Sequence, residues 1–306
     1  MGLNNFLGIE DHYCQQDDSY FEIISIPYER TTSYGKGTST GPDAIIKASQ
    51  YVELYDEQFQ IEAYKKGVFT SEPVDVNGTI ETVFKNIEEK VSKSLKKGKF
   101  PISLGGEHTI TYAILAAFGK DEPVSVIHLD AHGDTAVMFG GTRVSDASIF
   151  QLATVEGVID PERTIQIGMR GRGIYRCEFS QACGMRMIKV EEFKKLGVEA
   201  VVQEARNIVG DGPLYLTIDT DVFDCAVMPG TTLPEPFGLS GEEVRDIIRG
   251  LRGLNIVGAD LMELSPPYDA TGMSACLASG IAFELLCLLA ESCAIHGGMQ
   301  RKTHWH

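Results

Sequence analysis

The sequence is short of positive charge. Its 306 residues include 27 Lys and Arg against 43 Asp and Glu, which gives a net charge of −16. A chain this acidic repels the phosphates of nucleic acids and of anionic membranes, so neither is expected as a partner, whereas metal cations and amines suit it better. The apolar fraction of 43% is that of a globular protein and excludes a disordered or fibrous chain.

Several signals of export and membrane insertion are also missing. None of the seven cysteines forms a CxxC pair, and their odd number argues against a fully paired secreted framework, so free thiols are expected. The N-terminus lacks the basic and apolar regions of a signal peptide. The apolar stretch 276–290 contains Glu284 and is short for a membrane span. These absences predict a cytoplasmic protein without a membrane partner.

Signatures of nucleotide binding and of multiple domains are absent as well. The glycine-rich segments 35–41 and 168–173 match neither GxGxxG nor a phosphate-binding loop, and we interpret them as turns. No linker, internal repeat or low-complexity tract divides the chain. We therefore predict one domain over 1–306, with a core at about 20–290, a peripheral arm at 1–19 and a peripheral tail at 292–306.

Short apolar runs alternate with helical periodicity along the whole chain. The runs are continuously apolar, which is typical of strands buried on both faces of a parallel sheet. Their alternation with helices predicts an α/β layer structure. The expected strands are 22–26, 101–104, 124–129, 164–169, 214–218 and 256–261, and the expected helices are 80–97, 108–118, 191–208, 241–251 and 271–290.

Three groups of acidic residues and histidines each follow an expected strand. Because the carboxyl ends of parallel strands share one edge of the sheet, these groups are expected to meet there. The D-x-H-x-D and D-x-D spacings also place alternate residues on one side of an extended segment. The residues are His108 in GGEH, Asp130, His132 and Asp134 in DAHGD, and Asp219 and Asp221 in DTD.

The four aspartates of these groups require cations. Ionised carboxylates cannot share a small volume unless positive charge neutralises them, and two divalent ions would balance four of them. Oxygen and imidazole ligands without thiolate favour Mn²⁺ or a similar ion over structural zinc, with Ni²⁺ as an alternative. Two such ions activate a bridging water and polarise an electrophile, which is typical of a hydrolase.

Four sequence blocks resemble the ureohydrolases, the superfamily of arginase and agmatinase. They are 104–112 (LGGEHTITY), 127–136 (IHLDAHGDTA), 217–237 (TIDTDVFDCAVMPGTTLPEPF) and 260–270 (DLMELSPPYDA), with weaker agreement at 32–46. The resemblance covers about 20–290. It implies an arginase-like three-layer α/β/α sandwich around a mainly parallel sheet of about eight strands, and two metal ions per chain.

The resemblance also implies roles for single residues. One metal ion would be held by His108, Asp134 and Asp221, the other by His132, with Asp130 and Asp219 as bridges. In catalysis, Asp134 or solvent would pass protons to the leaving amine. The acidic residue that receives the substrate guanidinium corresponds to Glu235, and a carboxylate does accept two parallel N–H bonds from a guanidinium.

The sequence departs from the family at Asp146. Family members usually carry a proton-shuttling His about a dozen residues after the position of Asp134, and here Asp146 stands in its place. An aspartate has a reference pKa of about 3.9, which is too low for a shuttle at neutral pH. We therefore expect Asp146 to bind a cationic part of the substrate, with a proton shuttle and a solvated loop residue as alternatives.

The substrate is expected to be a small cationic guanidino compound. Cys225 replaces the usual Pro, 232–233 replaces the usual Gly-Thr, and 135–142 offers no Asn/Ser cluster for an amino-acid carboxylate. These features favour agmatine, converted to urea and putrescine, over arginine. The alternatives are guanidinobutyrate, guanidinopropionate or guanidine as substrate, or a metal-binding pseudoenzyme with a structural or regulatory role. The resemblance further implies a homo-oligomer, a trimer or hexamer.

Overall fold

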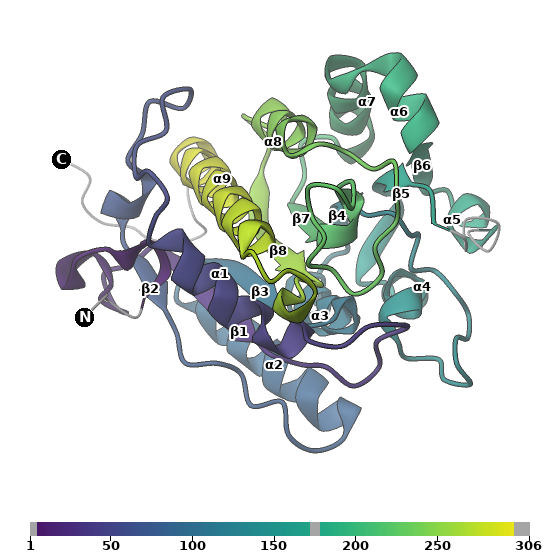
Figure 1. Ribbon diagram of the computed structural model, residues 1–306, viewed down its shortest axis with the longest axis horizontal. Helices are drawn as coiled ribbons and strands as arrows, with labels where there is room; N and C mark the ends of the chain where they lie inside the picture. Colours follow the sequence, from purple (N-terminus) through teal and green to yellow (C-terminus); the bar gives the residue numbers. More distant parts are fainter. Residues whose placement is uncertain (1–4, 172–177, 297–306) are drawn as a thin grey trace.

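Eight strands form one sheet in the computed structural model, which describes residues 5–171 and 178–296 (Figure 1). The strand order is β2-β1-β3-β8-β7-β4-β5-β6, and every neighbouring pair is parallel. The strands are β1 Phe21–Ile26, β2 Val68–Thr70, β3 Phe100–Gly105, β4 Val124–Leu129, β5 Ile159–Met169, β6 Arg186–Lys189, β7 Leu214–Asp219 and β8 Ile256–Met262.

The apolar runs form strands that are buried on both faces of the sheet, as expected. Every residue of β1, β4 and β7 is buried, because helices cover both faces of the sheet. All six expected strands are present. The edge strands β2 and β6 were not predicted, since they have only three and four residues and are partly exposed.

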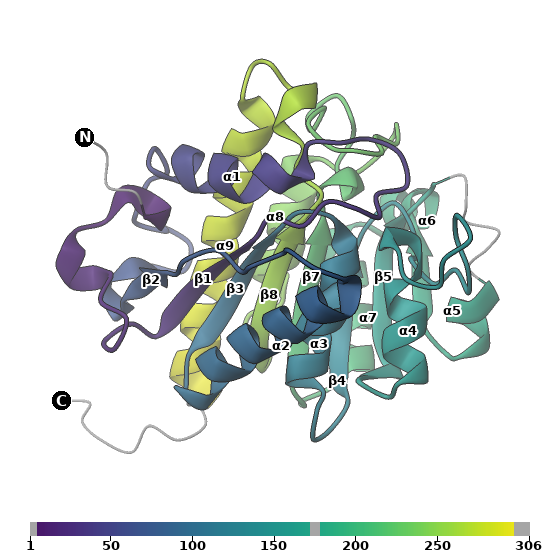
Figure 2. The same cartoon turned by 90° about the horizontal axis from the view of Figure 1, so that it is seen from below.

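Helices on both faces complete the predicted three-layer α/β/α sandwich (Figure 2). One apolar cluster lies under α2, α3 and α4, and the other lies under α1 and α6 to α9. The helices are α1 Gly41–Ser49, α2 Ile80–Lys96, α3 Thr111–Phe118, α4 Ile149–Val155, α5 Glu178–Ala182, α6 Val190–Leu196, α7 Val198–Val209, α8 Gly241–Gly250 and α9 Met273–His296. The helix expected at 191–208 is two helices, because Gly197 adopts a φ of 81° between them.

Helix α9 is longer than its sequence predicted. Its 24 residues are long and apolar enough to cross a membrane, whereas the shorter stretch 276–290 was not expected to be. However, most of the apolar part of α9 is buried inside the fold, where the helix packs against β8, α1 and α8. A buried core helix can be equally apolar, so the burial explains the apolar composition without a membrane.

The chain ends differ from the expected arm and tail. Phe6 and Ile9 of the expected arm are buried in the core, and the backbone N–H of Leu7 donates to Ser49 Oγ at 2.8 Å. Of the expected tail, the part up to His296 continues α9, and 297–306 lies outside the described residues, as do Gly173 and Cys177. Among the described cysteines, free thiols are found at Cys14, Cys183, Cys225, Cys276 and Cys287, as expected.

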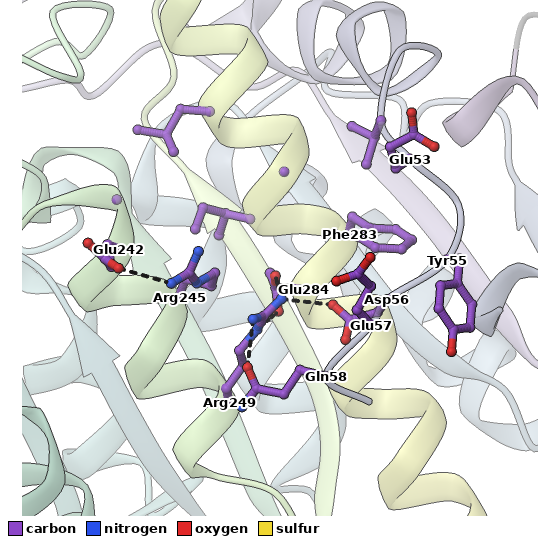
Figure 3. Close-up of a pocket in the computed structure, with 15 residues that line it drawn as sticks. Glu53, Tyr55, Asp56, Glu57, Gln58, Glu242, Arg245, Arg249, Phe283 and Glu284 are labelled. Carbon is purple, nitrogen blue, oxygen red and sulfur yellow. Dashed lines mark hydrogen bonds and ion pairs between the residues drawn. The ribbon is translucent and has the colours of Figure 1, made fainter. Parts of the chain in front are cut away.

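A buried ionic cluster joins α8 and α9 to the loop that follows α1 (Figure 3). The Arg249 guanidinium donates to Glu284 through Nε (2.8 Å) and Nη2 (2.6 Å), to Asp56 through Nη2 (2.8 Å), and to Gln58 through Nη1 (2.7 Å). We call these four residues the Arg249 network. One cation here satisfies two buried carboxylates from two separate segments.

Candidate metal centre

The six predicted metal ligands meet at the carboxyl ends of three strands. The GGEH group follows β3, the DAHGD group follows β4, and Asp219 ends β7. In the sheet these strands lie in the order β3-β8-β7-β4, so the three groups converge on one edge. Glycine is required where the backbones are closest: a Cβ on Gly106 would lie 1.9 Å from the Tyr28 carbonyl oxygen.

One ring nitrogen of His108 faces three carboxylates without a hydrogen bond to the described residues. The hydroxyl of Thr217 donates to Asp260 at 2.5 Å, so its oxygen accepts from His108 Nε2–H at 2.9 Å. In the neutral imidazole, Nδ1 of His108 then carries the lone pair. It lies 3.2–3.3 Å from one oxygen each of Asp130, Asp134 and Asp219, yet makes no hydrogen bond within the described chain.

A second group forms around His132. Its Nδ1 lies 2.8 Å from Asp221 Oδ2 and 3.5 Å from Asp130 Oδ1. The structure thus corrects the expected division of ligands: Asp221 lies with His132 rather than with His108, because the backbone N–H of Ala131, next to His132, donates to Asp221 Oδ1. Asp130 belongs to both groups, which is the arrangement of a bridging ligand.

His128 is a participant that the sequence analysis did not assign. It is fully buried on β4, its Nε2–H donates to Asp130 Oδ2 at 2.7 Å, and its Nδ1 accepts from Gln166 at 3.0 Å. Both ring nitrogens are therefore used, so His128 orients the shared carboxylate. Its position two residues before Asp130, on the same side of the strand, was the available signal.

Crowding changes the proton affinities of the site. Burial and then the charge of Asp130 raise the pKa of Asp134 to about 7, and burial followed by neighbouring carboxylates also raises the pKa values of Asp219 and Asp221. Burial alone would lower the pKa of the His108 imidazole, but the carboxylates raise it well above the usual value. The chain thus binds protons where it lacks other positive charge.

These observations fit two divalent cations. A buried nitrogen lone pair aimed at three carboxylate oxygens is unfavourable unless a cation lies between them. The donors are carboxylate oxygens and imidazole nitrogens without a thiolate, a set that suits Mn²⁺ and similar ions. His108, Asp130, Asp134 and Asp219 would hold one ion. Asp130, His132 and Asp221 would hold the other.

Glu235 lies at the rim of the centre. Its Oε1 is 3.5 Å from His132 Nε2, and its side chain is 16% exposed. Arg170 holds this rim: its guanidinium donates to the carbonyl oxygens of Glu235 and Asp221 at 2.7 Å each and of Pro236 at 2.9 Å. The loop that carries Glu235 is therefore fastened to the ligand loop after β7.

Besides Glu235, the site has a second glutamate, Glu263, whose role was not predicted from the sequence. It directly follows β8, in the left-handed region at φ 66°, and it is buried. Its oxygens accept from the backbone N–H of His108 and from Thr232 Oγ1, both at 2.6 Å. Burial and the charge of Asp146 raise its pKa well above the usual value. An acidic residue just after an expected strand, as at the other three groups, was the missed signal.

Asp146 lies on the loop between β4 and α4, and its carboxylate is engaged. Oδ2 accepts from the backbone N–H of Ser33 and Oδ1 from the Ser33 hydroxyl, both at 2.6 Å, and Oδ1 also accepts from Ala147 N at 2.7 Å. Asp146 is therefore close to the centre and is bound to the segment that links β1 to α1.

Comparisons with known proteins agree on one family. Residues 19–288 match the sequence model of the Arginase family. The chain is 38% identical to a guanidinopropionase of Pseudomonas aeruginosa, covering 89% of this chain and 87% of the relative, and 35% identical to a mitochondrial agmatinase of Gallus gallus, covering 87% and 80%. The structure of a proclavaminate amidino hydrolase from Streptomyces clavuligerus superposes with a TM-score of 0.89 at 30% identity, covering 95% and 98%.

Proposed function

The chain belongs to the arginase family and is a hydrolase of guanidino compounds, and from this premise we propose that it converts agmatine and water to putrescine and urea. The lone pair of His108 Nδ1, facing three carboxylates, carries the assignment of a metal-dependent hydrolase. The choice of agmatine rests on charge. Agmatine carries a guanidinium and an ammonium group, which suit an entrance that holds Glu235, Glu263 and Asp146 beyond the four aspartates.

The arginines around the entrance support this choice. A substrate with a carboxylate tail needs a cation, but the Arg30 guanidinium donates to the carbonyl oxygens of Gly78 and Val76. Arg170 is likewise committed to backbone carbonyls. Both cations thus stabilise loops and contribute little free positive charge to the entrance.

In the mechanism, the chain binds the guanidinium and moves protons. Two bound divalent ions would supply an activated water and polarise the guanidinium. Glu235 accepts guanidinium N–H bonds from the rim, while Glu263 does so from the opposite side, next to His108. Asp134 takes a proton from the attacking water and passes it to the leaving amine nitrogen. Addition of water at the guanidinium carbon and cleavage of its bond to the substituted nitrogen then give urea and the amine.

Guanidino acids are the second candidate substrates, and the relative named guanidinopropionase favours them. Arg143, which is exposed on the loop before Asp146, is a cation that could meet a carboxylate tail. If guanidinopropionate is the substrate, Arg143→Ala should raise its KM about tenfold or more, the loss typical of a hydrogen bond to a charged group. If agmatine is the substrate, the same variant leaves its KM unchanged.

The deciding experiment is urea release from agmatine, 3-guanidinopropionate, 4-guanidinobutyrate, arginine and guanidine, after reconstitution with Mn²⁺ or Ni²⁺. We expect the highest kcat/KM for agmatine with Mn²⁺. A higher kcat/KM for a guanidino acid would overturn the substrate proposal, and a higher value with Ni²⁺ would overturn the metal proposal.

We also propose that the protein is a cytoplasmic homo-oligomer, a trimer or hexamer. The family resemblance supports the assembly, and the free thiols of the described residues Cys14, Cys183 and Cys287 support the location. Sedimentation of the pure protein at micromolar concentration tests the assembly, and a monomer would refute it. Fractionation of the source cells tests the location.

A further inference from the structure

The segment between β1 and α1 crosses the carboxyl ends of the strands (Figure 2) and is fastened along its length by carboxylates. Glu107, next to His108, accepts from the backbone N–H groups of Arg30 and Thr31 at 2.8 Å each. Within the segment itself, Glu29 Oε2 accepts from Gly37 N at 2.6 Å and closes its turn. Because Glu107 adjoins a metal ligand, the position of this segment is coupled to the metal centre.

The same segment packs directly on the residues that carry Glu263 and Thr232. A Cβ on Gly35 would lie 2.8 Å from the Thr232 carbonyl oxygen, and one on Gly37 would lie 2.7 Å from the Pro267 ring. These glycines allow an approach that other residues would block. Tyr34, directly before Gly35, has 73% of its surface exposed. The segment is therefore seated closely beside the metal centre and presents one aromatic ring to solvent, and we call it the lip.

Asp146 supplies the middle fastening of this lip. Three donors converge on its two oxygens, two from Ser33 and one from Ala147 N, all at 2.6–2.7 Å. A carboxylate offers about four acceptor sites, so most of its capacity is used inside the protein. Since a backbone N–H faces each oxygen, an amide side chain would place its NH₂ against one of them. The geometry thus requires a carboxylate rather than a carboxamide.

We propose that Asp146 is a positioning residue that fixes Ser33 and Tyr34 at the lip and thereby sets substrate affinity. It contacts neither the substrate nor the transferred proton. The proposal rests on the proposed function for its substrate, but the tether itself is a property of the fold. It replaces our expectation that the Asp146 carboxylate binds a cationic part of the substrate.

The test is a double-mutant cycle of Asp146→Ala and Ser33→Ala, with Asp160→Ala as a remote surface control. We expect Asp146→Ala to raise KM about tenfold, Ser33→Ala to raise it about threefold, and the double variant to match Asp146→Ala, because both changes break one contact. The kcat and the metal content should change by less than about twofold. Additive effects in the cycle, or an unchanged KM in Ser33→Ala, would overturn the tether.

Hydrogen exchange of the amides of residues 32–35 gives a readout that needs no substrate. Exchange should become about tenfold faster in Asp146→Ala and also accelerate in Ser33→Ala, because both lose protection at this contact. Unchanged exchange would refute the tether even if no guanidino compound is hydrolysed, whereas faster exchange without turnover would refute only the proposed function. A kcat that rises in Asp146→His would show that the position moves protons instead.

Discussion

The metal centre and the Arg249 network both bury several carboxylates, but only the network contains its own permanent cation. In the network, Arg249 satisfies Asp56 and Glu284 through one guanidinium. At the metal centre, the ion-pair partners of the four aspartates within the described chain are histidines, whose own charge depends on pH. In the network each carboxylate has a permanent cationic partner, whereas the carboxylates of the centre are neutralised only when protons or metal ions bind.

This difference separates a structural cluster from a binding site. A carboxylate paired with an arginine holds two segments together and has no charge left for a ligand. Carboxylates whose partners are only histidines bind cations strongly. When no cation is bound, their mutual repulsion destabilises the folded protein. Variants of the two clusters should therefore change different properties of the protein.

The largest effect is expected for the shared ligand. Asp130→Asn should abolish binding of both metal ions and lower urea release more than the roughly 10–100-fold loss typical of outer-shell changes. His108→Ala and Asp221→Ala should each lower occupancy below two ions per chain. Metal analysis after Mn²⁺ incubation measures this, with Glu284→Gln as the matched control that keeps its metal. Two ions bound to Asp130→Asn would contradict the assignment.

The reverse pattern is expected for the Arg249 network. Arg249→Met leaves Asp56 and Glu284 buried without a cation, which should lower the free energy of unfolding by about 3–5 kcal/mol. Arg245→Met, whose partners are largely exposed, should cost only about 0–1 kcal/mol. Urea denaturation measures both, and Mn²⁺ content should stay unchanged. If Arg249→Met bound less Mn²⁺, the two clusters would not be separate.

A smaller effect is expected for the residue that orients Asp130. His128→Asn removes the hydrogen bond from Nε2 and should weaken Mn²⁺ binding by about 10–100-fold. Competition with a chelator measures the affinity. His296→Asn is the control, because His296 is exposed and its ring bonds, among the described residues, to the Gly253 carbonyl oxygen. Equal affinities of the two variants would mean that His128 serves only packing.

The smallest effect is expected from pH. In the metal-free protein the pKa of Asp134 is raised to about 7 and that of His108 is also raised, so the folded state binds more protons than the unfolded state. Stability should therefore fall as pH rises from about 5.5 to 7.5, by a few degrees in Tm. With saturating Mn²⁺ the trend should reverse, because metal binding requires deprotonated ligands. Parallel trends in both forms would refute the linkage.

Motif-bearing residues were predictable from the sequence, because short patterns after buried strands determine where side chains converge. His108, Asp130 and Asp219 could be placed at one sheet edge in this way. Whether Asp221 lies beside His108 or His132 could not be predicted, because this depends on a hydrogen bond from the backbone N–H of Ala131, which joins two loops. Likewise, the partner of Asp146 is Ser33, 113 positions away in sequence, and no local pattern encodes that contact.

Elements at the margins of the fold were also beyond prediction. The edge strands β2 and β6 carry too few apolar residues to stand out. The buried Phe6 lies in a segment without periodicity, so its place in the core depends on the packing of this segment against α1 and on the bond from its backbone N–H to Thr70 of β2. Long-range packing decided each of these features.

The position of β8 has a consequence for biosynthesis. The last strand made is the one that joins β3 to β7, so the two parts of the sheet share no strand pairing until residues 256–262 have been synthesised. Chains emerge from the ribosome at about 5–20 residues per second, and for the time between β7 and β8 the nascent protein exposes two open apolar sheet edges. This protein should therefore depend on chaperones late in translation, and its metal centre should load only after β8 has closed the sheet.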